Sequence, residues 1–128
     1  MKKASLMLTA LICFFSLLTF VSCKKEDKSD KKITAEVSTI EKGEVLFTEN
    51  NCTACHLPDQ KVIGPSLQQT AKIYKQKNGS IVSFLKEESP PIVDESLYET
   101  MKINLQLTKM MSDEELQSLE LYILSHSK

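Results

Sequence analysis

The sequence predicts a small all-α domain that follows an export signal. No segment alternates apolar and polar residues as a half-buried strand does, whereas several segments place apolar residues at helical spacing. These segments begin after serines that can cap a helix, and two of them end at Asn-Gly or Pro-Pro pairs. The chain has 128 residues, enough for one domain.

The N-terminal segment has the pattern of a secretory signal peptide. Lys2 and Lys3 give a basic start, and residues 4–21 are uncharged and mostly apolar. A run of about 18 apolar residues is also close to the length that spans a bilayer. A transmembrane anchor is therefore the alternative interpretation of the same residues.

The residues after this run favour cleavage. Val21 and Ser22 lead directly to Cys23 and then to a charged stretch. This resembles the lipobox of bacterial lipoproteins, although Phe20 is a less usual residue three places before the cysteine. The resemblance implies that residues 1–22 are removed and that Cys23 is lipidated. We therefore expect an exported bacterial lipoprotein, held by acyl chains at a membrane and facing the periplasm or the cell surface.

Charge dominates the segment that follows. Residues 24–32 read KKEDKSDKK, so residues 23–37 are expected to form a lipidated and flexible tether with little to bury. From Cys23 onward the chain has 14 lysines against 17 acidic residues, a net charge of −3. It has no Arg and no basic stripe, which argues against a nucleic-acid partner.

The first two predicted helices begin at serines. Ser38 and Glu41 have the spacing of a capping box, which predicts a helix over residues 39–51. Ser66 precedes a second helix over residues 67–76. The cysteine motif lies in the connection between these two helices.

Three further elements follow. Ser80 is expected to cap a helix over residues 81–87, and a short helical turn is expected over residues 95–101. Ser112 and Glu115 form the clearest capping box of the chain and mark the start of the last helix. All of these elements belong to one domain.

That domain, residues 38–128, has little material for a core. The whole chain contains no Trp, five Phe and three Tyr, and small domains bury proportionally less surface than large ones. A bulky apolar cofactor would fill the centre of such a domain.

The motif CTACH offers three chemistries. A structural zinc site needs four ligands, and apart from Cys52, Cys55 and His56 the exported chain offers only His126 and the lipidated Cys23. A redox dithiol is typical of a βαβ context, and no strand is predicted here. Cys-x-x-Cys-His is the attachment signal of haem c. Haem attachment is favoured, with zinc and a dithiol as alternatives.

The chain resembles the class I c-type cytochromes, especially the short bacterial monohaem members, over residues 38–126. Gly43 and Phe47 match positions on the first helix of that family, and Leu119 and Tyr122 match positions on its last helix. The resemblance implies a cytochrome c fold, with four to five helices wrapped around one covalently bound haem. Plain core packing is the other interpretation of these four residues.

The resemblance also implies a cofactor site. Cys52 and Cys55 would bind one haem c per chain covalently, and His56 would be an axial ligand of its iron. Ile63 and Gly64 precede Pro65 at the spacing of the family, in which the carbonyl oxygen of this proline accepts a hydrogen bond from the axial histidine.

The sixth ligand is implied less directly. Met101 begins a Met-x-x-Asn sequence in which Asn104 would hold the sulfur in place, on a loop that crosses the haem face. The prolines usual between them are absent. Met110 is the next candidate, while Met111 is assigned to packing at the start of the last helix.

Such ligation implies one-electron transfer rather than catalysis, because no coordination position stays open. We therefore expect a membrane-tethered carrier in a respiratory chain, not an enzyme. Its redox partners would be a quinol-oxidising complex and a terminal reductase or oxidase. The alternatives are a fixed haem subunit of a larger respiratory complex and a sensor or peroxidase whose sixth ligand is displaced.

Overall fold

The computed structural model describes the backbone of residues 28–128 and the side chains from Thr39 onward. The predicted signal peptide and Cys23 lie outside the described residues. Residues 32–128 form one compact unit, and the described part of the other unit, residues 1–31, is limited to the start of one helix. No helix in the described range is both long and apolar enough to cross a membrane.

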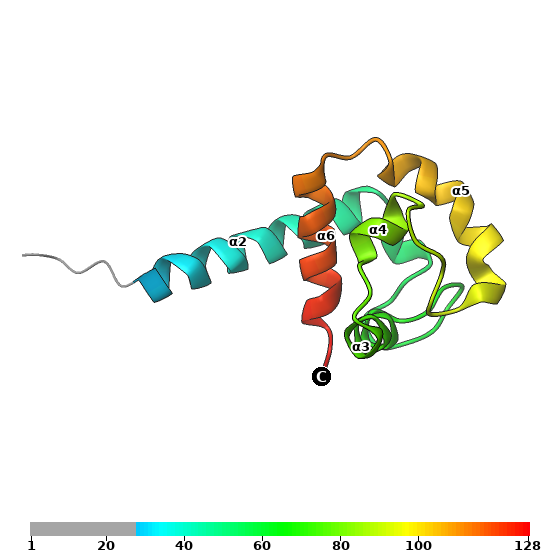
Figure 1. Ribbon diagram of the computed structural model, residues 1–128, viewed down its shortest axis with the longest axis horizontal. Helices are drawn as coiled ribbons and strands as arrows, with labels where there is room; N and C mark the ends of the chain where they lie inside the picture. The colour runs from blue at the N-terminus through cyan, green and yellow to red at the C-terminus, as the bar shows by residue number, and fades with distance from the viewer. Residues whose placement is uncertain (1–27) are drawn as a thin grey trace, which may run out of the picture. The chain divides into compact units, whose positions relative to one another are not determined.

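Residues 28–128 contain five α-helices, two short 3-10 helices and no strand, which confirms the predicted all-α class. The helices, labelled as in Figure 1, are α2 (Lys28–Glu49), α3 (Leu67–Lys77), α4 (Ile81–Leu85), α5 (Tyr98–Thr108) and α6 (Asp113–Ser125). The 3-10 helices are η1 (Cys52–Ala54) and η2 (Glu95–Leu97). Helix α6 contacts both α3 and α4, so the last helix organises the fold.

The first helix differs from the sequence-based expectation. Helix α2 begins at Lys28 instead of residue 39 and ends at Glu49 instead of residue 51. Ser38 therefore lies inside the helix and is not its N-cap, and residues 28–37, expected to be a flexible tether, are helical. This segment contains neither Gly nor Pro, so nothing in it interrupts a helix that continues toward the N-terminus.

The second and third helices, α3 and α4, match the sequence-based expectation more closely. Ser66 caps α3, because its Oγ accepts a hydrogen bond from the backbone N–H of Gln69 at 3.1 Å. Ser80 caps α4 through the N–H of Ser83. Helix α4 ends at Leu85, two residues earlier than expected.

Helix α5 differs more from the sequence-based expectation, and the difference changes where Met101 lies. The helical turn expected over residues 95–101 is in fact η2 followed by an α-helix of 11 residues. Met101 therefore lies in a helix and not on a loop. The physical reason is the absence of proline: Lys102 and Ile103 keep their backbone N–H groups, so the helix continues through the Met-x-x-Asn sequence.

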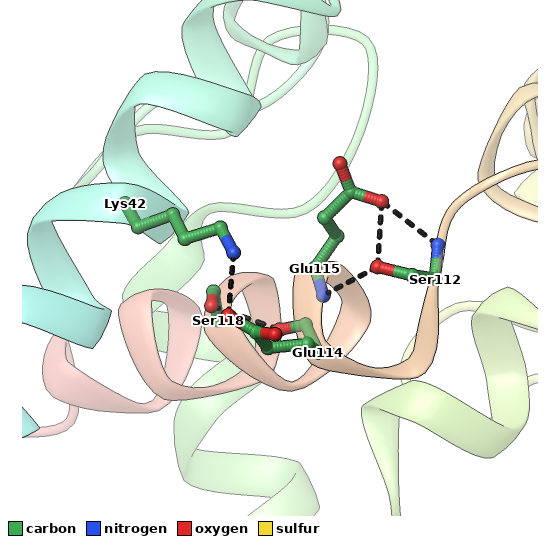
Figure 2. Close-up of polar contacts among 5 residues, drawn as sticks. All are labelled: Lys42, Ser112, Glu114, Glu115 and Ser118. Atoms are coloured by element: carbon green, nitrogen blue, oxygen red, sulfur yellow. Dashed lines mark hydrogen bonds and ion pairs between the residues drawn. The ribbon is translucent and has the colours of Figure 1, made fainter.

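Figure 2 shows the predicted capping box at the start of α6, which the structure confirms. Glu115 Oε2 accepts a hydrogen bond from the backbone N–H of Ser112 at 2.8 Å, and Ser112 Oγ accepts one from the N–H of Glu115 at 3.3 Å. Beside it, Lys42 of α2 forms a 2.8 Å ion pair with Glu114 of α6. The two helices are thus joined next to the cap.

Helices α2 and α6 cross at Gly43. A Cβ added there would lie 2.0 Å from the backbone oxygen of Ser118 and 2.7 Å from Cβ of Tyr122, so only glycine permits this approach. One turn later, the buried Phe47 ring lies 5.4 Å from the Tyr122 ring, and Leu119 is buried as well. These are the four positions that matched the first and last helices of the c-type cytochromes.

Candidate haem-attachment site

A sharp turn after α2 presents the cysteine motif. Asn51 adopts a left-handed conformation with a φ of 58° and precedes η1. The backbone N–H groups of Cys55 and His56 both donate to the carbonyl oxygen of Cys52, at 3.2 and 3.0 Å. This turn places the two thiols and the imidazole on the wall of one cavity.

His56 is held in one orientation. Its Nδ1 lies 2.8 Å from the backbone oxygen of Pro65. A carbonyl oxygen can only accept, so Nδ1 carries the proton and Nε2 keeps its lone pair. Gly64 lies against the same ring, and a Cβ there would come within 2.4 Å of His56 Cε1. The imidazole is therefore prepared to bind a metal through Nε2.

The cavity beside the motif lies where a conventional core would be. Its atom-free space is about 1280 Å³, including the open solvent at its mouth. Its wall includes most of the buried apolar residues of the domain, namely Phe47, Leu67, Tyr74, Ile81, Leu85, Leu119 and Ile123. The helices thus surround a space for a large apolar group.

The three candidate methionines occupy different environments. Met101 is half-buried and lines the cavity. Met110 is 78% exposed, and the described cavity wall includes neither Met110 nor Met111. Asn104 follows Met101 by one helical turn and lines the same cavity. The structure therefore brings Met101 and Asn104 to the site from helix α5.

The alternatives for the motif are not supported. Cys52 and Cys55 are free thiols, and burial raises the pKa of Cys52, whereas the attacking thiol of a redox dithiol has a lowered pKa. Among the described side chains, those of residues 39–128, no three His, Cys, Asp or Glu gather as a metal site. A structural zinc site would need such a cluster.

No local sequence pattern indicated the roles of two residues, Thr108 and Glu87, that shape the site. Thr108 is buried, lines the cavity, and donates its hydroxyl to the backbone oxygen of Leu85 at 2.7 Å. Glu87 contacts both Tyr98 and Lys109, at the two ends of α5. Both depend on how α4 and α5 pack together, which local sequence patterns do not specify.

Helices around an apolar cavity, with a Cys-x-x-Cys-His turn and a methionine on its wall, define a haem-attaching all-α domain. Residues 40–127 match the family model of cytochrome c, and the chain belongs to that family. No curated protein matches the chain. As a member of the cytochrome c family, the chain binds haem c covalently and takes part in haem-based electron transfer. Domains of this family usually carry one haem each. Domains of this family are typically electron carriers rather than enzymes.

The residues present fit this cofactor. Two free thiols with two residues between them suit covalent attachment, and the imidazole that follows them has a free Nε2. The apolar wall suits a porphyrin, and the close contact of Gly64 with the His56 ring leaves no room for the ring to turn in that direction.

Proposed function

We propose that the protein is a membrane-tethered one-electron carrier whose haem iron is ligated by His56 and Met101. The observation that carries the proposal is that both side chains lie on the wall of the same apolar cavity. The hydrogen bond between His56 and Pro65 supports it, because it fixes the tautomer that binds iron. Asn104, one turn from Met101, is proposed to orient the sulfur.

The bound haem supplies a one-electron iron couple, and a methionine ligand raises its potential relative to two histidines. The polypeptide holds the cofactor, ligates its iron and excludes water. Cys52 and Cys55 would hold the cofactor, and His56 and Met101 would both bind its iron, which would leave no coordination position for dioxygen or peroxide. Buried apolar side chains such as Leu119 exclude water from the cavity.

Electron exchange is proposed to take place at the mouth of the cavity. Ile63 and Leu107 line the cavity and are also 51% and 38% exposed. At these residues a bound cofactor would be nearest to solvent and to a partner. The proposed partners are a quinol-oxidising complex and a terminal reductase or oxidase.

Tethering rests on sequence alone. Cys23 is proposed to carry the lipid after removal of residues 1–22, and α2 begins shortly afterwards at Lys28. A tether of limited length confines the domain near the membrane and raises its effective concentration toward membrane-bound partners. Cys23→Ser should then abolish the incorporation of a labelled fatty acid into the exported protein. Unchanged labelling of the variant would refute lipidation at this residue.

The carrier function is tested with the haem-loaded protein in stopped-flow experiments. We expect rapid reduction by a small reductant, rapid reoxidation by ferricyanide, and no turnover of hydrogen peroxide with a phenolic donor. Sustained peroxide turnover would contradict the carrier proposal and favour a peroxidase. Purification in mild detergent provides a second test, because a stoichiometric partner would indicate a fixed subunit.

A further inference from the structure

Glu87 has an unusual backbone conformation. Its φ of 58° lies in the left-handed region that L side chains rarely adopt. It follows α4, where its N–H donates to Phe84 O at 2.9 Å and the N–H of Glu88 donates to Ser83 O at 2.8 Å. This is the Schellman pattern, whose left-handed position is usually glycine. A glutamate there is strained, so its side chain requires an explanation.

That side chain reaches both ends of α5. Glu87 Oε1 accepts a hydrogen bond from the hydroxyl of Tyr98, the first residue of the helix, at 3.3 Å. Glu87 Oε2 pairs with the ammonium group of Lys109, the residue after its last. The side chain of Glu87 is only 17% exposed, so solvent screens this contact less than an ordinary surface pair.

Electrostatics keep this carboxylate charged. The hydrogen bond with Lys109, and to a smaller extent its charge and the Tyr98 hydroxyl, hold the pKa of Glu87 below its usual value. Lys102 also lies near, with its ammonium nitrogen 5.7 Å from the centre of the Tyr98 ring. Lys109 and Lys102, the two lysines that lower the pKa of Glu87, come from the C-terminal end of α5 and from α5 itself.

A second contact ties the same two helices together. The buried hydroxyl of Thr108, the last residue of α5, donates to the backbone oxygen of Leu85, the last residue of α4. At the other end, the rings of Phe84 and Tyr98 lie 6.3 Å apart. The end of α4 therefore holds both ends of α5.

Met101 lies between these contacts. Tyr98, Met101, Leu105 and Thr108 recur at helical spacing, so they share one face of α5. Met101 and Thr108 both line the cavity, and Leu105 is fully buried. A shift of either end of α5 along or around its axis would therefore move the methionine sulfur.

We propose that Glu87 is a positioning residue that clamps α5 at both ends and thereby holds Met101 on the haem iron. The inference rests on the proposed His56 and Met101 ligation. It explains how a methionine on a helix without neighbouring prolines is held, and why a strained position has glutamate in place of glycine. Glu87 does not touch the reacting atoms and acts through α5.

The test measures how fast imidazole replaces methionine in the ferric, haem-loaded protein. At saturating imidazole the rate is that of breaking the sulfur–iron bond, after which an imidazole nitrogen binds the iron. The variants are Glu87→Gly, which relieves the backbone strain, Glu87→Gln, which removes the charge, and Lys109→Met, which leaves α4 unchanged. Lys86→Ala is the matched control, because it removes the adjacent ion pair, with Asp113 of α6.

We expect the two Glu87 variants and Lys109→Met to exchange at least about tenfold faster than wild type, since hydrogen bonds to charged groups are strong enough for such a factor. Lys86→Ala should match wild type. Exchange at the wild-type rate in all three clamp variants, or equal acceleration by Lys86→Ala, would overturn the clamp. If wild type itself lacked methionine ligation, the proposed function would be overturned and this inference with it.

Discussion

The imidazole of His56 and the carbonyl group of Pro65 are joined by a 2.8 Å hydrogen bond from Nδ1 to the backbone oxygen. The bond spans nine residues, so the loop between them is folded back onto the cysteine motif. A further backbone bond, from the N–H of Gly64 to the oxygen of Cys55 at 2.9 Å, closes the same loop. The orientation of His56 Nε2, the proposed iron ligand, is thus set by the loop.

Gly64→Ala should disturb this arrangement. The new Cβ would lie 2.4 Å from His56 Cε1, so either the ring or the loop must move. We expect a lower yield of haem-loaded protein and a shifted reduction potential, measured by absorbance and redox titration. Gly79→Ala is the matched control, because its Cβ would crowd the side chains of Ile92 at 2.8 Å and Tyr74 at 3.0 Å but not the His56 ring. Equal behaviour of the two variants would contradict a role for Gly64 at the ring.

Met101→Ala should remove the sixth ligand, because Met101 is the methionine on the described cavity wall. We expect loss of the weak far-red sulfur-to-iron band and a potential lowered by on the order of 100 mV or more, within the span of about 0.8 V that axial ligands set. Met110→Ala, at a residue that is 78% exposed, should keep both properties. A methionine-ligated spectrum in Met101→Ala would show that this assignment is wrong.

Gly43→Ala should destabilise the crossing of α2 and α6. The added methyl group would lie 2.0 Å from a backbone oxygen, that of Ser118, which cannot turn away as a side chain can. We expect the free energy of unfolding of the haem-loaded protein to fall by about 1–3 kcal/mol, the usual cost of overpacking. Denaturant unfolding measures it. An unchanged midpoint would mean that the helices separate without cost.

His126 should make the stability of the protein pH-dependent. The structure places its ring 5.0 Å from that of Tyr122, with Nε2 buried and unpartnered among the described residues. Burial lowers the pKa of His126, and Lys128 lowers it further, while the charge of Glu44 opposes this shift. The neutral imidazole is therefore favoured in the folded state.

The direction of this pH dependence follows from the difference in proton binding between the folded and the unfolded chain. Because the pKa of His126 is lower in the folded chain than in the unfolded one, the unfolded chain binds more protons as the pH falls below about 6.5. The contribution of His126 is fully present above that pH and is lost as the pH falls through the folded pKa. His126→Gln should flatten this part of the pH dependence of unfolding. An identical profile in the variant would exclude His126 as its source.

The sequence predicted what local chemistry determines. The all-α class, the serine caps of α3, α4 and α6, and haem c as the cofactor follow from short motifs with a clear physical meaning. The Ser112 box is the best case, because its two hydrogen bonds lie within four residues. The start of α2 was missed because a capping-box pattern also occurs inside a helix, at Ser38.

Tertiary packing explains the remaining differences. Helix α5 was expected as a single turn, and nothing local indicated that α4 would support it through Glu87 and Thr108. Met101 lines the cavity even though it stands on a helix instead of a loop.

The most direct test of the account is an optical spectrum of residues 24–128, exported by a host that matures c-type cytochromes. The oxidised and reduced forms are recorded, and carbon monoxide is then added. We predict covalently bound low-spin haem with the far-red methionine band, unchanged by carbon monoxide at neutral pH. A high-spin haem that binds carbon monoxide at once would contradict His56 and Met101 ligation and favour a sensor or peroxidase.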